Sequence, residues 1–228
     1  MSQSHDKSEK ITLKGKLSLL IQKYSYILLG SIIAIVFLVI GLLIYNSLQM
    51  KNLEKDTQQI ESIQDDFENL GSFTDDEKLD SARKEIEEKL NILIDDGKKN
   101  YVLQRALFIR ATMFFQDEDW DKSIEDFKLL AELFSSSYLA PISLINAAIA
   151  FENSGKIDKA IEEYNTVVNN YSSVSPEIPN VYFSIGRLFE HKSDKTAALE
   201  AYNNLLDNFP DSNWTNLARS RIIYLESN

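Results

Sequence analysis

The most constraining feature of this chain is a run of twenty residues, Tyr26 to Tyr45, without a charged side chain. As a helix rising about 1.5 Å per residue, such a run extends about 30 Å, the hydrocarbon thickness of a bilayer. A tyrosine stands at each end, where an amphipathic ring favours the headgroup level. We therefore expect one transmembrane helix over residues 26–46, preceded by a leader of residues 1–25.

Charge is distributed unevenly about this apolar run. The leader holds five lysines against two acidic residues, a net +3, whereas the part after the run carries a net −14. Because basic residues beside a first span stay in the cytoplasm, we expect a single-pass inner-membrane protein whose C-terminal domain is periplasmic. The alternative is a eukaryotic outer-membrane anchor with a cytosolic domain.

A cleaved signal peptide is a second alternative for the apolar run. Its apolar region would span about 7–15 residues and end at a small-residue cleavage site. The run here is longer, and residues 43–47 (LIYNS) offer no such site, which favours a retained anchor. Gly30 and Ala34 form a small-xxx-small pair through which two copies could associate, so the pattern allows a homo-oligomer.

The composition excludes several chemistries. Cysteine is absent, which removes disulfides, thiol catalysis and cysteine-based zinc sites. His5 and His191 belong to no metal-ligand spacing, and no glycine-rich phosphate-binding motif is present. The abundant carboxylates are typical of solvated helix faces, and their excess argues against nucleic acid. We expect no enzyme, no cofactor and no metal.

The part after the apolar run repeats one helical pattern three times. A small residue is followed by an aromatic residue four positions later and an aliphatic residue three further on, which places all three on one helix face. In each repeat a second small residue stands twelve positions before the first. A short polar turn, at 116–119, 153–155 or 191–194, separates the two small residues. The paired small residues are Ala111 with Ser123, Ala148 with Ala160, and Gly186 with Ala198.

This pattern resembles the tetratricopeptide repeat, with Gly155 and Pro210 at the family's turn glycine and terminal proline. The resemblance implies an all-α solenoid of antiparallel helical hairpins in residues 101–228. The repeats would cover about 101–137, 138–175 and 179–210, followed by a capping helix at 211–226. The units recur after 37 and 38 residues rather than about 34, and we place the extra residues in loops at 135–137 and 172–179.

Residues 47–100 are expected to form a juxtamembrane helix and a degenerate first hairpin. The sequence Thr74-Asp-Asp-Glu77 has the form of a capping box before a helix that reaches about Asp96. At the other end, Asp211 or Ser212 would cap the last helix, and Arg219 and Arg221 would give its outer face a polar finish.

The first helix of each hairpin should line a concave groove that binds protein partners. Carrying the repeat register across the three units gives a mixed apolar lining with two arginines. The inward positions are Arg105, Phe108, Thr112 and Phe115; Ile142, Ile145, Ile149 and Asn153; and Asn180, Phe183, Arg187 and Glu190. The alternative is that some of these side chains only fill the core.

The layout is similar to that of single-span tetratricopeptide proteins that include the ancillary subunit of the bacterial Sec translocon. That resemblance implies a membrane-anchored scaffold whose partners are translocon components or periplasmic chaperones. Two further readings are a self-associating assembly factor of the cell envelope and, with reversed topology, a cytosol-facing docking receptor.

Overall fold

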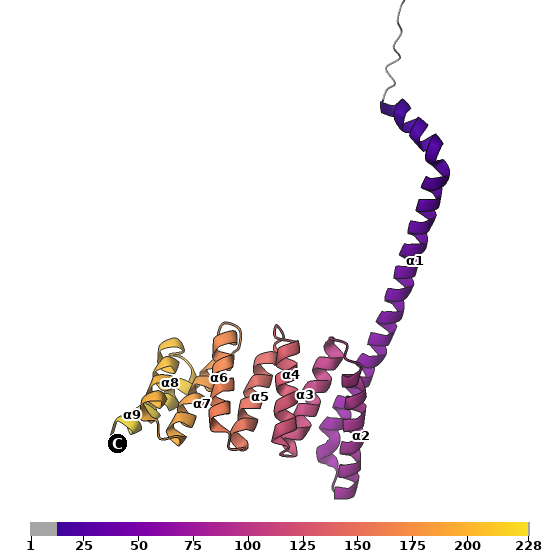
Figure 1. The fold of residues 1–228 in the computed structure, drawn as a ribbon. Helices are drawn as coiled ribbons and strands as arrows, with labels where there is room; N and C mark the ends of the chain where they lie inside the picture. Colours follow the sequence, from indigo (N-terminus) through magenta and orange to yellow (C-terminus); the bar gives the residue numbers. More distant parts are fainter. Residues whose placement is uncertain (1–12, 228) are drawn as a thin grey trace, which may run out of the picture. The chain divides into compact units, whose positions relative to one another are not determined.

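The computed structural model describes residues 13–227, and this range is helical without a strand (Figure 1). The chain divides into two compact units, residues 1–55 and 56–228. The predicted all-α class with a tetratricopeptide-like solenoid and one apolar N-terminal helix is confirmed. Of the predicted leader, residues 1–12 lie outside the described residues.

The first unit contains most of α1 (Leu13–Glu68), whose backbone leaves helical geometry at Tyr24 (φ −110°, ψ 15°). Past this point the helix carries the apolar run, and its described side chains are exposed. Its most apolar window has a mean hydropathy of 2.5, and none of that window is buried. By length and composition α1 could cross a membrane, and a signal sequence would share these properties.

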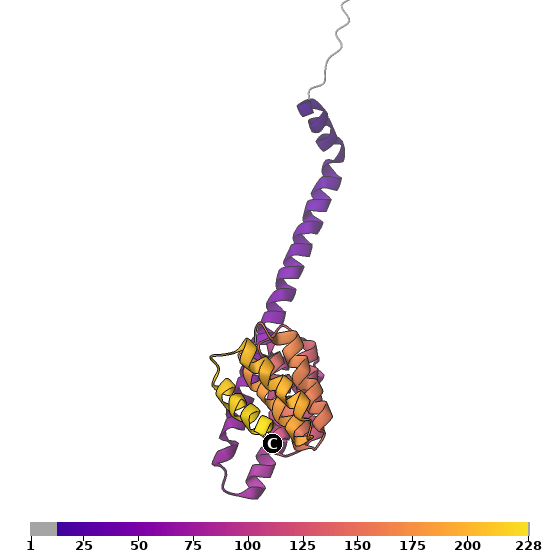
Figure 2. The same cartoon turned by 90° about the vertical axis from the view of Figure 1, so that its left-hand side faces the viewer.

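The second unit is a stack of helical hairpins, which Figure 2 shows one behind another. The predicted turns are confirmed, since helices end at Gln116, Asn153 and His191. After the end of α1 come η1 (Asn69–Ser72), α2 (Asp76–Asp95), α3 (Tyr101–Gln116), α4 (Trp120–Leu133), α5 (Leu139–Asn153), α6 (Ile157–Tyr171), α7 (Ile178–His191), α8 (Lys195–Asn208) and α9 (Asn213–Ser227). The loop predicted to reach residue 179 is shorter, because Ile178 and Pro179 already belong to the first turn of α7.

The paired small residues let the two helices of each hairpin approach closely, and all six are buried. In the third hairpin a Cβ added to Gly186 would lie 2.4 Å from the Tyr202 ring, so only glycine fits. In the first hairpin the Ser123 hydroxyl donates to the carbonyl of Ala111 at 2.9 Å. Ser123, which stands where the other two hairpins have Ala160 and Ala198, therefore adds a hydrogen bond across the same close contact.

The three hairpin turns share one backbone conformation. Each has a residue of positive φ seven positions after the first small residue: Glu118 (60°), Gly155 (75°) and Ser193 (62°). The next residue donates its N–H to the carbonyl five positions earlier at 2.8–2.9 Å, as in a Schellman C-cap. Gly155 is the one residue of the three that adopts this left-handed conformation without strain.

In the N-terminal hairpin, the end of α1 and α2 pack onto α3. Ile60 and Ile63 of α1 join Ile86 and Leu90 of α2 in one buried cluster with the outer face of α3. The predicted capping box is wrong by one residue. Asp75 caps α2 by accepting the Lys78 N–H at 3.1 Å, and Thr74 lies outside the helix.

Helix α9 covers the other end of the stack, and Ser212 caps it by accepting the Trp214 N–H at 3.3 Å. Trp214 and Ala218 face α7 and α8 in one cluster. Arg219 is exposed, as expected for a polar finish. The same expectation for Arg221 is wrong, because its guanidinium bonds to Glu190 of α7.

Candidate functional site on the concave face

Helices α3, α5, α7 and α9 continue one register, in which Ala111, Ala148, Gly186 and Ser220 are equivalent. At each junction between successive helices of this row, two positions meet. One is four residues after the small residue of the first helix, and the other is one residue after the small residue of the next helix. At two of the three junctions this contact is an ion pair. The pairs are Glu152 with Arg187, at 2.6 and 2.7 Å, and Glu190 with Arg221.

Glu152 is a residue that the sequence analysis missed. Its register position was assigned to Asn153, but Asn153 is exposed at the last residue of α5, one position past the row. Because Glu152 occupies the row, it meets Arg187 with both carboxylate oxygens. A one-residue shift at the helix end, where 3.6-residue periodicity leaves neighbouring positions ambiguous, accounts for the error.

The inward positions of the first repeat are occupied by contacts within the chain. Arg105 donates to Gln64 of α1, and the Thr112 hydroxyl donates to the Phe108 carbonyl at 2.8 Å. Phe108 packs edge-on against Phe127 of α4, and Phe115 packs against Trp120, with ring centroids 5.8 and 5.1 Å apart. This end of the groove is therefore largely filled.

Two inward positions of the third repeat, Phe183 and Glu190, are covered in the same way by α9. Phe183 stacks on Trp214 with ring centroids 5.2 Å apart. Glu190 accepts from the Arg221 guanidinium and from the Tyr202 hydroxyl at 2.5 Å. The bond from Arg221 holds the pKa of Glu190 below its ordinary value.

Between these filled ends the second repeat opens into a pocket of about 940 Å³. Its floor contains three of the predicted groove residues, Ile142, Ile145 and Ile149, and Asn180 of α7 lies at one edge. Pro141 adds to the apolar floor. The structure therefore brings four of the twelve predicted residues together in one cavity.

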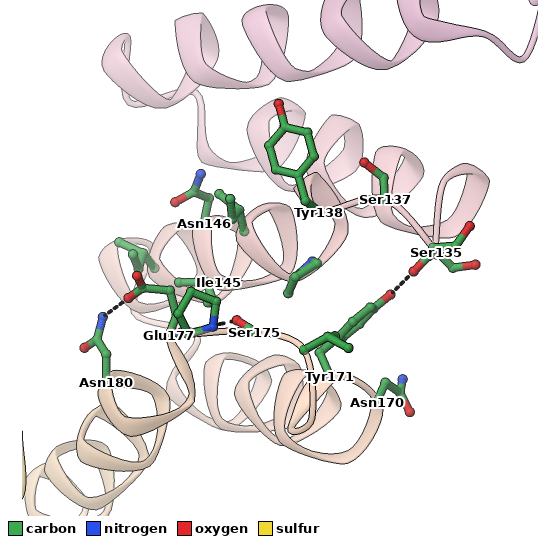
Figure 3. A pocket seen from close by; sticks show the side chains of 16 residues that line it. Ser135, Ser137, Tyr138, Ile145, Asn146, Asn170, Tyr171, Ser175, Glu177 and Asn180 are labelled. Carbon is green, nitrogen blue, oxygen red and sulfur yellow. Dashed lines mark hydrogen bonds between the residues drawn. The ribbon is translucent and has the colours of Figure 1, made fainter. Parts of the chain in front are cut away.

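Two loops build the wall of this pocket (Figure 3). They are residues 134–138, between α4 and α5, and residues 172–177, between α6 and α7. The Tyr171 hydroxyl, at the end of α6 where the second loop begins, donates to the carbonyl of Ser135 in the first loop at 3.1 Å. Burial raises the pKa of Tyr171, so this hydroxyl keeps its proton and stays a donor. These loops contain the extra residues that lengthen the spacing between repeats to 37 and 38 residues, compared with about 34 in the tetratricopeptide family.

The pocket rim contains residues that the repeat register could not identify. Tyr138 and Val174 are large apolar side chains that remain 70% and 72% exposed. Asn146 and Asn170 lie along the lining, and Glu177 is its one charged residue. The signal for them in the sequence was the excess length of the two loops, because loops longer than a scaffold requires often carry function.

Comparison with known proteins finds the same type of repeat in this chain. A model of the tetratricopeptide repeat family matches residues 145–213, which include much of the pocket. A TPR repeat-containing protein of Treponema pallidum (strain Nichols) is 30% identical over 113 residues, 50% of this chain and 46% of its own length. This chain therefore spans about half the length of that relative.

Sequence and fold together support the tetratricopeptide repeat family. A tetratricopeptide repeat protein from Parabacteroides merdae superposes with a TM-score of 0.55 at 15% identity, covering 75% of this chain and 61% of that chain. A putative kinesin light chain from Podosopora anserina, with TPR-like repeats, gives 0.52 at 10% identity and covers 75% and 85%. At these identities the solved structures show the shared fold. Tetratricopeptide proteins are generally scaffolds that bind other proteins.

Proposed function

We propose that this chain is a membrane-anchored scaffold that binds partner proteins in the pocket of its second repeat, without catalysing a reaction. The observation that carries the proposal is the pocket itself. Ring contacts and an ion pair within the chain occupy Phe108 and Phe115 of the first repeat and Phe183 and Glu190 of the third. In the second repeat Ile142, Ile145 and Ile149 line an open cavity of about 940 Å³ with exposed apolar side chains at its rim.

We place the solenoid on the periplasmic side of a bacterial inner membrane, near the Sec translocon or periplasmic chaperones. Support comes from the exposed apolar helix α1, from the basic leader before it and from the acidic charge after it. The translocon is suggested by the similar layout of the ancillary-subunit family, which is an argument from architecture.

Topology is tested by fusing reporters after Asn228. A reporter active only outside the cytoplasm should be active in this fusion, and a cytoplasmic reporter should be silent. The opposite result would reverse the placement and make a cytosol-facing docking receptor the function to pursue. A processed, shorter product in the membrane-free fraction would show that the apolar helix is a signal sequence.

Partner binding is tested by site-specific photocrosslinking in cells. A crosslinking amino acid replaces Tyr138 at the pocket rim, and the matched control replaces Ile92 of α2, which is 66% exposed and lies outside the pocket. We expect Tyr138 to capture defined envelope proteins that Ile92 does not capture. Equal capture at the two positions would remove the pocket as the binding site.

A further inference from the structure

We infer that the pocket accepts an extended partner segment with aliphatic side chains and a lysine or arginine, and that it rejects segments with carboxylates at that place. This inference rests on the proposed function, because it names the partner chemistry of the same pocket. It follows from the apolar floor, the charges of the lining and the free amides beside it.

The floor defines the aliphatic part of the ligand. Ile142, Ile149 and Pro141 form a continuous apolar surface at the bottom of the cavity, and Tyr138 and Val174 extend it onto the rim. A volume of about 940 Å³ lies at the upper end of the range for pockets that enclose small ligands. Several side chains of one segment can therefore enter together.

The lining defines the charge of the ligand. Its sixteen residues include no lysine, arginine or histidine, and Glu177 is the one carboxylate among them. Glu177 accepts only a long bond of 3.4 Å from Asn180 and does not cap α7 with its side chain. Its charge is therefore available to a cation on the ligand.

The nearest arginine on the concave row cannot reverse this preference. Arg187 binds both carboxylate oxygens of Glu152, so its charge is already neutralised. A carboxylate entering the pocket would lose water, meet no cation among the lining residues and lie near Glu177, and each of these effects is unfavourable. A lysine or arginine would instead pair with Glu177 at the rim.

The amides along the lining define the backbone conformation of the ligand. Within residues 13–227, the side-chain amides of Asn146 and Asn170 bond to no other residue. Each amide offers a donor and an acceptor, the complement of a peptide group. An extended segment has peptide groups free to use them, whereas a helix satisfies most of its own.

The test is a selection of random twelve-residue peptides displayed on phage against the full-length chain in detergent micelles. Binding of the selected peptides is then measured by fluorescence anisotropy. We expect aliphatic residues with lysine or arginine to be enriched and aspartate and glutamate to be depleted. Glu177→Lys should weaken these peptides on the order of fivefold, the effect of one partly exposed ion pair. Glu200→Lys, the same change on the exposed face of α8, should leave binding unchanged.

A second pair of variants separates this inference from the proposed function. Val174→Asn, which removes an apolar contact at the rim without adding charge, should weaken binding at the pocket, whereas Ile92→Asn, a matched change on α2, should not. Peptides that depend on Val174 but are acidic, or are indifferent to Glu177→Lys, would overturn the partner chemistry and leave the pocket as the binding site. If no selected peptide depends on Val174, the pocket fails as a binding site and both proposals fall.

Discussion

The three hairpin turns place different residues in the same left-handed conformation, and this predicts substitutions of opposite sign at equivalent positions. Gly155 has a φ of 75°, whereas Glu118 and Ser193 adopt φ of 60° and 62° with a side chain attached. The backbone hydrogen bonds of the three turns are the same. Any difference in stability at these positions therefore comes from the backbone preference of the residue.

The magnitude follows from two opposing effects. A left-handed conformation costs a residue with a side chain about 1–2 kcal/mol relative to glycine. Glycine in turn loses more freedom on folding, which offsets about 0.4–1 kcal/mol of this difference. Gly155→Ala should therefore lower the free energy of unfolding by about 1 kcal/mol, although an added Cβ would meet nothing within 4 Å. Glu118→Gly and Ser193→Gly should each raise it by about 0.5–1 kcal/mol.

The assay is urea denaturation of residues 56–228, the compact unit that contains the buried apolar clusters found among the described residues. With an m-value of about 2–3 kcal/mol per molar, a change of 1 kcal/mol moves the midpoint by about 0.4 M. Ser172→Gly is the control, since Ser172 is exposed at a φ of −56° and glycine there should destabilise. If Ser193→Gly lowered stability as Ser172→Gly does, the assignment of strain to the left-handed turn would be refuted.

Four further substitutions test the packing and the charges of the solenoid. Gly186→Ala should destabilise it by about 2–3 kcal/mol, because the new Cβ would lie 2.4 Å from the Tyr202 ring; a thermal midpoint unchanged from wild type would contradict the close approach. Arg110→Met should lower the free energy of unfolding, measured by urea denaturation, by about 3 kcal/mol, because Asp126 is only 3% exposed and would lose its two 2.7 Å bonds from Arg110. The double variant Arg110→Met with Asp126→Leu should recover most of this stability. The pKa of Glu190 is lowered by its bound arginine, so its stabilisation is present above the unfolded pKa of about 4.3 and is lost as pH falls through the folded value. Glu190→Gln should therefore flatten the acid side of the stability profile, and an unchanged slope below pH 5 would argue against this ion pair.

Much of the fold could be predicted from sequence because its determinants are local or periodic. The spacing of small and aromatic residues fixed which helices pair, and the short polar turns fixed where they end. Predictions failed at single positions near helix ends, where Asp75 rather than Thr74 caps α2 and Glu152 rather than Asn153 enters the concave row. At a helix end, adjacent residues offer nearly the same chemistry, and small differences in backbone geometry decide between them.

The candidate site was less accessible to sequence reasoning. The repeat register indicated Ile142, Ile145 and Ile149, but it indicated Phe183 and Glu190 with equal weight. Whether an inward position is open depends on what the neighbouring helix places against it. Trp214 and Arg221 of α9 cover Phe183 and Glu190, and nothing in the register of α7 alone reveals this.

The sequence by itself determined the apolar helix, the acidic charge of the solenoid and the pairing of its helices, since each depends on residue type and spacing within a few turns. The tertiary structure decided which part of the concave face stays open. Ser135 and Tyr171 are 36 residues apart, and their hydrogen bond forms only because successive hairpins stack and bring their loops together. The pocket thus depends on contacts between repeats, which a pattern within one repeat does not specify.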